Sequence, residues 1–223
     1  MDITRRVLAG MIDHTLLKPE ATPVQIERLC EEAQQYHFAT VCINPLYVSL
    51  AARMLAGSDV AVCTVVGFPL GATPTRVKRF EAENALADGA RELDMVLPIG
   101  LLKAGAHDEV RADIAALAEL CHRHGALLKV ILETALLTEA EKIAGCQAAM
   151  AAGADFVKTS TGFGGGGATV ADVRLMRQAV GTALGVKAAG GIRTLADALA
   201  LIEAGATRIG ASAGVAIVEA LPA

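Results

Sequence analysis

The sequence predicts an α/β protein of the (β/α)8 barrel class, also called a TIM barrel, built as a single domain over residues 1–223. Three observations lead to this prediction. Short apolar runs occur eight times, a helical pattern follows each of them, and residues typical of helix starts and ends separate the two. A length of 223 residues suits one large α/β domain, and no shift in composition divides the chain.

The expected strands are short runs rich in apolar residues. They cover residues 11–15, 39–43, 60–66, 91–97, 127–133, 155–160, 185–189 and 207–211. The expected helices cover residues 22–36, 45–55, 73–88, 107–124, 138–152, 169–180, 194–204 and 213–221. Many of these helices open with Thr or carry Pro in the first turn. Several end at Gly, for instance at Gly89, Gly125, Gly153 and Gly205.

A doubly wound open sheet is the competing architecture. It would need a glycine fingerprint after its first strand, and the segment DHTLLKPE at residues 13–20 has none. The glycine run at residues 162–167 resembles a flexible linker in composition, but it is short and lies between well-predicted elements. The barrel is therefore the better prediction.

Composition bears on partners and location. A net charge of −4, few aromatic residues and no basic run argue against nucleic acid as a partner. The chain has no long uncharged apolar run and no signal-peptide pattern, so we expect neither a membrane span nor export. The cysteines are odd in number and scattered, which favours reduced thiols in the cytoplasm. His122 and His124 stand two apart at a helix end, a spacing that favours solvated side chains over a metal site, and no metal or other cofactor is expected.

Charged residues alternate with apolar residues in four of the expected strands. Successive strand residues point to opposite faces, and the outer face of a barrel packs against helices. The charged side chains are therefore expected inside the barrel: Glu92, Asp94, Lys129, Glu133, Lys158 and Lys187. The alternative is a charge-compensated network without a function, but such a network costs desolvation and adds little stability.

Lys158 and Lys187 are expected near the ends of neighbouring strands. A neutral lysine amine can attack a carbonyl carbon to form a Schiff base, but a free lysine has a pKa of about 10.4. A second ammonium about 6 Å away would lower that pKa by about 2 units at an effective dielectric constant of about 20, and burial would lower it further. We expect Asp94 across the barrel mouth, where it transfers protons directly or through water.

Glycine-rich segments follow the last three expected strands, at residues 162–167, 189–193 and 210–214. Such segments bring backbone N–H groups close to an anion, and a phosphate site is frequent in this part of the fold. A helix that begins near Ser212 would point its N-terminus at the phosphate. Each glycine pair taken alone is equally well explained as a tight loop. Together they predict a phosphorylated carbonyl substrate above a Schiff-base lysine.

Five segments resemble the deoxyribose-phosphate aldolase family: IDHTLLKP at 12–19, ELDMV at 92–96, LKVILET at 128–134, DFVKTSTGF at 155–163 and VKAAGGIRT at 186–194. The resemblance runs from about residue 12 to residue 215. It implies a class I aldolase that needs no metal. Such an enzyme reversibly cleaves 2-deoxy-D-ribose 5-phosphate to acetaldehyde and D-glyceraldehyde 3-phosphate through a lysine Schiff base.

The resemblance also assigns residues. Lys158 matches the lysine that forms the Schiff base, Lys187 the lysine that lowers its pKa, and Asp94 the proton-relay carboxylate. The positions that match the phosphate loops are Gly162, Gly190, Gly191, Gly210 and Ser212. Asp13 and Thr15 match polar residues near the substrate hydroxyls.

Three features depart from the pattern of some relatives. Phe163 stands in place of a lysine near the phosphate, and Ala213 in place of a second serine, so we expect weaker phosphate binding. The C-terminal tyrosine that assists proton transfer in some relatives is not found here, and the two tyrosines are Tyr36 and Tyr47. Proton exchange is therefore expected to depend on the inward carboxylate, the second lysine and water.

The residues leave three rival functions open. One is a Schiff-base aldolase with a different donor, another is a phosphosugar isomerase, and the third is a phosphate-binding barrel without catalysis. An isomerase needs a carboxylate or His base but no lysine pair, and a binding protein has no need of Lys158, Lys187 and Asp94 together. The expected partners are phosphorylated sugar and aldehyde substrates and further copies of the chain, in a dimer or tetramer.

Overall fold

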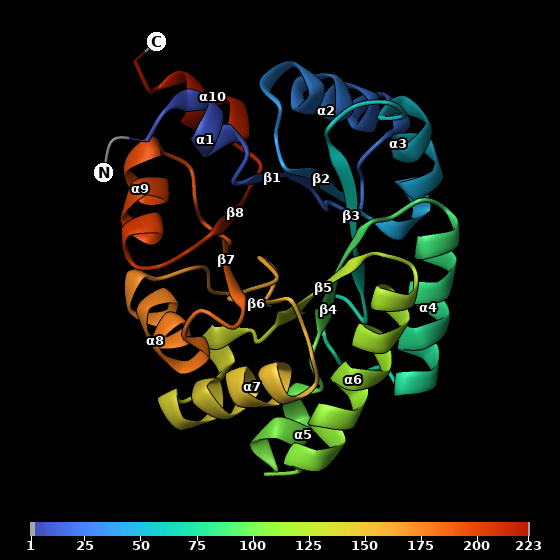
Figure 1. Cartoon of the computed structure of the whole chain (residues 1–223), viewed down its shortest axis with the longest axis vertical. Coiled ribbons are helices and arrows are strands. Elements are labelled where there is room, and N and C mark those ends of the chain that lie inside the picture. The colour runs from blue at the N-terminus through green and yellow to red at the C-terminus, as the bar shows by residue number, and fades with distance from the viewer. Residues whose placement is uncertain (1–2, 223) are drawn as a thin grey trace.

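The computed structural model of the chain describes residues 3–222, so residues 1, 2 and 223 of the predicted 1–223 domain lie outside the described range. Eight parallel strands form a closed barrel in chain order, and helices surround it (Figure 1). The predicted (β/α)8 barrel is confirmed. The strands are β1 (Ile12–Leu16), β2 (Thr40–Ile43), β3 (Ala61–Val66), β4 (Glu92–Val96), β5 (Leu127–Ile131), β6 (Phe156–Lys158), β7 (Gly185–Ala189) and β8 (Arg208–Ala211).

All eight predicted helical regions are helical. They contain α2 (Pro23–Tyr36), α3 (Val48–Met54), α4 (Thr75–Ala87), α6 (His107–Arg123), α7 (Glu139–Ala151), α8 (Val170–Val180), α9 (Leu195–Glu203) and α10 (Gly214–Glu219). Three short elements are not predicted: α1 (Arg5–Ala9), α5 (Ile99–Lys103) and the 3₁₀ helix η2 (Thr134–Leu136). The 3₁₀ helix η1 (Pro45–Tyr47) forms the start of the predicted helical region 45–55. None of the helices in residues 3–222 has the length and apolar character needed to span a membrane.

Local signals explain where the helices begin and end. Thr22, Thr138 and Thr194 each accept a hydrogen bond from the backbone N–H three residues later, and the side chain of that residue bonds back to the threonine N–H. Gly89 and Gly205 follow the ends of α4 and α9 with φ of 111° and 114°, a region in which other residues are strained.

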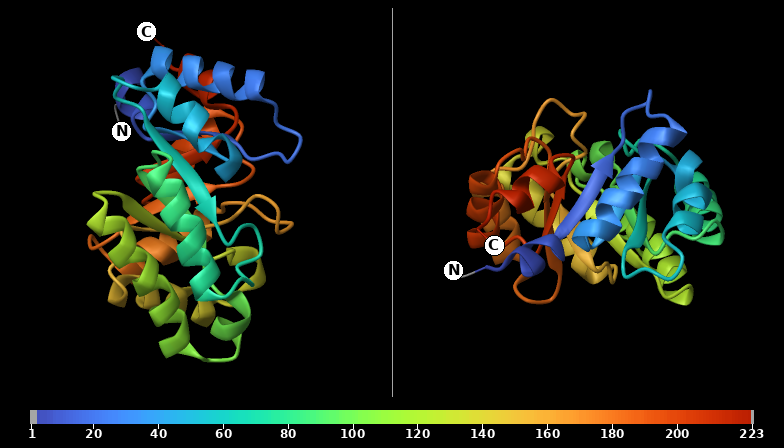
Figure 2. Two further views of the ribbon diagram at one scale, coloured as in Figure 1. Left: turned by 90° about the vertical axis from the view of Figure 1, so that its right-hand side faces the viewer. Right: turned by 90° about the horizontal axis from the view of Figure 1, so that it is seen from above.

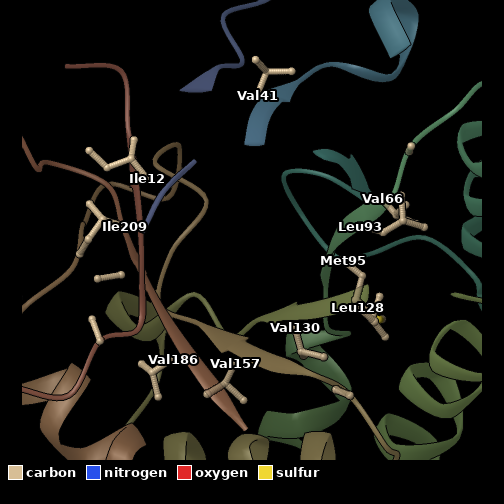
Figure 3. Packing of buried hydrophobic residues seen from close by; sticks show 14 of the residues in the cluster. Ile12, Val41, Val66, Leu93, Met95, Leu128, Val130, Val157, Val186 and Ile209 are labelled. Carbon is tan, nitrogen blue, oxygen red and sulfur yellow. The ribbon is translucent and has the colours of Figure 1, made fainter. Parts of the chain in front are cut away.

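Alternation along the strands separates an apolar outer face from a charged inner one. The outward residues belong to one continuous buried cluster shared with the helices, and Figure 3 shows them at close range. The cluster includes Ile12, Val41, Leu93, Val130, Val157, Val186 and Ile209. The residues of opposite parity, among them Asp94, Lys129, Lys158 and Lys187, are buried inside the barrel. The predicted inward direction of these four side chains is confirmed.

The loops that follow the strands gather at one end of the barrel. Figure 2 shows the loop after β1 and the loop after β6 projecting from that same end. At the chain ends, α1 and α10 lie side by side, and Arg5 Nε donates a 2.6 Å hydrogen bond to the carbonyl of Leu221. In barrels of this class the end that carries the loops after the strands is the one that holds functional residues.

Candidate active site

Four cations and three carboxylates form an ion network inside the barrel. They come from six strands: Asp13 from β1, Glu92 and Asp94 from β4, Lys129 from β5, Lys158 from β6, Lys187 from β7 and Arg208 from β8. Every member is in salt-bridge contact with at least one other, and all are buried or nearly so. With all groups charged, the network holds one positive charge in excess.

Asp94 lies at the centre of this network. Its Oδ2 is 2.8 Å from Lys158 Nζ and 2.7 Å from Lys187 Nζ, and its Oδ1 is 2.8 Å from Lys129 Nζ. Burial raises the pKa of Asp94, but the three ammonium groups outweigh burial and hold the pKa well below its usual range. The sequence places Asp94 across the mouth. The structure places it inside the barrel, in direct contact with both lysines.

Lys187 bridges two carboxylates. Its Nζ is 2.5 Å from Asp13 Oδ2, while Asp13 Oδ1 is 2.6 Å from Arg208. Burial lowers the pKa of Lys187, but Asp13 and Asp94 outweigh burial and raise it above its usual value. Lys187 is therefore a fixed positive charge. Because Lys158 and Lys187 contact the same oxygen at 2.8 and 2.7 Å, their Nζ atoms are at most 5.5 Å apart.

Lys158 has the fewest ionic contacts of the three lysines. Among the carboxylates of residues 3–222 it contacts Asp94 alone, whereas Lys187 contacts two and Lys129 contacts three. If one amine in the network loses its proton, the excess charge disappears. Loss of that proton from Lys158 breaks a single ion pair, which makes it the member best suited to act as a neutral nucleophile.

Lys158 also lines a cavity of about 390 Å³. Six of the seven residues predicted to bind substrate or phosphate line the same cavity: Thr15, Gly162, Gly190, Gly191, Gly210 and Ser212. Asp13, Asp94 and Lys187 do not line it and lie within the barrel network instead. A second cavity of about 400 Å³, between residues 70–74 and 98–101, has no titratable side chain in its lining.

The cavity contains an anion-binding region away from Lys158. Within residues 3–222 no acceptor is found for the backbone N–H groups of Gly162, Gly191 and Ser212. Gly162 and Gly191 have φ of 87° and 80°, so these two turns need glycine. Lys18 and Arg193 line the same cavity, and both are exposed and have no carboxylate within salt-bridge distance in residues 3–222. The sequence reasoning missed these two cations, although both lie inside the resembling segments.

Two glycine-loop expectations need adjustment. Gly210 belongs to β8, and a Cβ atom on it would lie 3.0 Å from Lys187 Cε, so the glycine makes room for that lysine as well as lining the cavity. The helix expected to begin near Ser212 is α10, which begins at Gly214. Ser212 therefore precedes the helix and lies in the loop after β8.

The prediction that Glu133 points into the barrel beside Lys129 is wrong. Strand β5 ends at Ile131, and Glu133 takes a left-handed backbone conformation with φ of 58°. Its carboxylate accepts hydrogen bonds from Thr161 in the loop after β6. Arg208 fills an inward position that the sequence reasoning missed. Its alternation with Ile209 is the signal that identifies it.

The cysteines are free thiols, and some of them lie beside the carboxylates of the ion network. All five cysteines are buried and free, and Cys63 Sγ lies 3.2 Å from Asp94 Oδ1 and 3.3 Å from Lys129 Nζ. Two sets of potential metal ligands lie inside the barrel, Cys42–Cys63–Asp94 and Asp13–Cys63–Glu92. Lysine ammonium groups already contact the carboxylates of both sets, so the sets fit a metal ion poorly.

Neither tyrosine lines the cavity that contains Lys158.

Phe163 lines the cavity with half of its surface exposed, and its ring packs edge-on against Phe68 at 5.4 Å between centroids. This contact joins the loop after β6 to the loop after β3. An aromatic side wall therefore stands where the resemblance places a lysine in some relatives.

Comparisons with known proteins agree with this geometry. Residues 7–220 match the family described as DeoC/LacD family aldolase. The deoxyribose-phosphate aldolase of Thermococcus gammatolerans is 62% identical over 214 residues, which cover 95% of each chain. A crystal structure of a putative deoxyribose-phosphate aldolase from Coccidioides immitis matches with a TM-score of 0.94 and 47% identity, over 98% of this chain and 87% of that one. The tetrameric deoxyribose phosphate aldolase from Aeropyrum pernix matches with a TM-score of 0.92 and 36% identity, over 97% and 92%.

The family match covers nearly the whole chain, and the relatives have nearly the same length. The resemblance noted in five segments of the sequence is thereby confirmed. The chain belongs to the DeoC/LacD family of aldolases.

Proposed function

We propose that the chain reversibly cleaves 2-deoxy-D-ribose 5-phosphate to acetaldehyde and D-glyceraldehyde 3-phosphate through a Schiff base on Lys158. One observation carries this proposal. Lys158 stands where the ion network meets a cavity that also contains free backbone N–H groups and two exposed cations. A carbonyl carbon can reach the amine while a phosphate on the same molecule meets the N–H groups.

In the proposed reaction the neutral Nζ of Lys158 attacks C1 of the open-chain sugar, and water leaves to form the Schiff base. Removal of the proton from the 3-hydroxyl breaks the C2–C3 bond and releases D-glyceraldehyde 3-phosphate. The electrons of that bond pass to the enamine. Protonation of the enamine at C2 and hydrolysis then release acetaldehyde and restore the amine.

Asp94 is the proposed proton carrier. Three ammonium groups keep it ionised at rest, so it accepts hydrogen bonds rather than protons. It becomes a better proton acceptor when a neighbour loses positive charge, as happens when Lys158 becomes neutral. Lys187 stays charged throughout and favours the neutral form of the amine at most 5.5 Å away.

The Lys187→Leu variant is expected to cleave about a hundredfold more slowly at pH 7. A positive charge at most 5.5 Å away contributes about 3 kcal/mol at an effective dielectric constant of about 20, which corresponds to about a hundredfold in rate. The variant also leaves Asp94 to pair with Lys158 and Lys129 alone. Borohydride trapping with acetaldehyde should therefore need a higher pH in the variant than in the wild type, and the loss of activity should shrink toward pH 9.

Lys187→Leu breaks buried ion pairs, which costs about 3–5 kcal/mol of stability. The melting temperature is therefore measured alongside each assay. Lys187→Met provides a second neutral side chain that is closer to lysine in shape. Coincident trapping profiles in the wild type and a folded variant would show that Lys187 does not tune the amine.

The Ser212→Glu variant tests the phosphate region. It places a carboxylate beside the free N–H groups, and repulsion of a phosphate about 6 Å away raises KM for the phosphorylated sugar about tenfold. For the sugar without a phosphate, KM should change much less. Ser212→Gln has similar bulk without the charge and serves as the control. Equal losses on both sugars would place the phosphate elsewhere.

Product analysis tests the function as a whole. NMR of the wild type with 2-deoxy-D-ribose 5-phosphate should show acetaldehyde and D-glyceraldehyde 3-phosphate in equal amounts. A phosphosugar isomerase would instead produce a five-carbon isomer, and a binding protein would leave the sugar unchanged. An aldolase with another donor would act only on a different phosphosugar.

Two further predictions accompany the function. We propose a homo-oligomer, a dimer or tetramer, because the Aeropyrum pernix relative is described as tetrameric and because Leu70 and Phe80 expose 73% and 66% of their surface. Light scattering measures the mass directly. A cytoplasmic location stays a prediction of the cysteine pattern.

A further inference from the structure

Glu133 combines two unfavourable features next to the proposed nucleophile. Its backbone is left-handed with φ of 58°, a conformation that residues other than Gly rarely adopt. Its side chain is 2% exposed, and Oε1 is buried with no hydrogen-bond donor in residues 3–222. A buried carboxylate with an unpaired oxygen costs free energy, so its contribution to stability is a poor reason for its presence.

The other oxygen of Glu133 fastens the loop that follows β6. Oε2 accepts hydrogen bonds from both the N–H and the hydroxyl of Thr161. Thr161 Oγ1 in turn accepts the N–H of Phe163 at 3.0 Å. A continuous chain of hydrogen bonds therefore runs from the end of β5 through Thr161 to the residue that packs on Phe68.

The glycine loop closes directly over this carboxylate. A Cβ atom built on Gly164 would lie 2.6 Å from Glu133 Cδ, so no side chain fits there while the carboxylate keeps its place. Backbone bonds connect the same two segments, from Leu132 N to Lys158 O and from Thr134 N to Thr159 O, both at 2.9 Å.

We propose that Glu133 is a positioning residue that fastens residues 161–164 to the barrel mouth and thereby presents the free N–H of Gly162 to the phosphate of the substrate. Glu133 does not line the cavity, whereas Thr161, Gly162 and Phe163 do, so it acts through the loop. The inference rests on the proposed function, because it assigns a task to the loop in phosphate binding.

Lys158 does not depend on this contact for its own position. It belongs to β6, where it is paired in register with Ile131 of β5 and Lys187 of β7, and its Nζ contacts Asp94. Loosening the loop should therefore affect phosphate binding and leave Schiff-base formation with acetaldehyde nearly unchanged. If Glu133 contributed only to the stability of the fold, its substitution would lower phosphate binding and Schiff-base formation together.

The test compares Glu133→Gln, Thr161→Val and the double variant. Hydrogen bonds to a charged group are about twice as strong as neutral ones, so each single variant should raise KM for the phosphorylated sugar about tenfold. For the unphosphorylated sugar, KM should change less than about twofold, and so should the rate of borohydride trapping with acetaldehyde. The double variant should resemble the single ones, because both weaken the same link between Glu133 and Thr161. The proposal would be overturned if the rises in KM of the two single variants multiplied in the double variant. It would also be overturned if trapping with acetaldehyde fell as much as binding of the phosphorylated sugar.

Matched controls lie elsewhere in the chain. Thr75 Oγ1 donates a 2.6 Å hydrogen bond to the buried carboxylate of Asp113, away from the cavity, so Thr75→Val removes an equivalent hydroxyl. It should lower the melting temperature without changing the ratio of the two KM values. A wild type that fails to cleave the phosphorylated sugar contradicts the proposed function, whereas an active wild type with unchanged KM in the variants contradicts the role of Glu133 alone.

Gly164→Ala provides an independent variant if Glu133→Gln does not fold. Its φ is not in the left-handed region, so the added methyl acts by displacing the Glu133 carboxylate. It should reproduce the rise in KM for the phosphorylated sugar. Gly100→Ala, where a Cβ atom meets nothing within 4 Å, is the control and should change KM for neither sugar. A Gly164→Ala variant with wild-type KM would contradict the proposed link.

Discussion

The Lys158→Ala variant is expected to lose all measurable turnover and to keep its fold. Among the lysines of residues 3–222, Lys158 alone both joins the ion network and lines the cavity beside the free N–H groups, so no other lysine there can take its place. Its removal leaves three cations and three carboxylates, and Asp94 keeps its contacts with Lys129 and Lys187. The buried network therefore stays balanced, which is why the barrel should remain folded.

The measurement is the rate of acetaldehyde release together with thermal unfolding. Lys103→Ala, which removes an exposed lysine that pairs with Glu141 on the barrel exterior, serves as the control and should turn over normally. A folded Lys158→Ala protein that retained one hundredth of the wild-type rate would mean that the nucleophile is a different group.

The Asp94→Asn variant should still form the Schiff base but turn over about 10² to 10⁴ times more slowly, the range typical for loss of a general acid–base group. The asparagine is similar in shape but does not carry protons at neutral pH. The network would then hold four cations and two carboxylates, and the larger excess charge favours loss of a proton from one amine. Borohydride trapping with acetaldehyde should therefore persist.

Exchange of the acetaldehyde methyl protons with D₂O isolates the proton step, because exchange requires the enamine. This exchange should slow in Asp94→Asn in proportion to turnover. Glu92→Gln removes a negative charge from the same network but touches only Lys129 and Arg208, so it should cause a smaller loss. A wild-type turnover rate in Asp94→Asn would reassign Asp94 to a structural role.

The sequence was sufficient to predict the barrel and the direction of its charged side chains. Strand residues alternate strictly, so the placement of Lys129 and Lys187 between apolar neighbours already shows which face they occupy. Short helices were missed because five residues, as in α1 and α5, complete little more than one turn and show no periodicity. Glu133 was placed wrongly because alternation says nothing about where a strand ends.

The contacts within the site were less predictable. The sequence indicated two lysines and a carboxylate but not that the carboxylate lies between the lysines, because that depends on how long side chains from β4, β6 and β7 meet inside the barrel. The lysine pair alone therefore did not indicate that both lysines contact one shared carboxylate. Lys18 and Arg193 were overlooked for a similar reason, since loops distant in sequence bring them to one cavity.

Borohydride trapping identifies the lysine that forms the Schiff base, which we expect to be Lys158. Wild-type protein is incubated with acetaldehyde, reduced with borohydride, digested and mapped by mass spectrometry. We expect one ethyl group, carried by the peptide that contains Lys158. We expect no adduct on Lys187 or Lys129, whose amines are held by two and three carboxylates. An adduct on another lysine, or the lack of any adduct in a preparation that cleaves the sugar, would contradict this expectation.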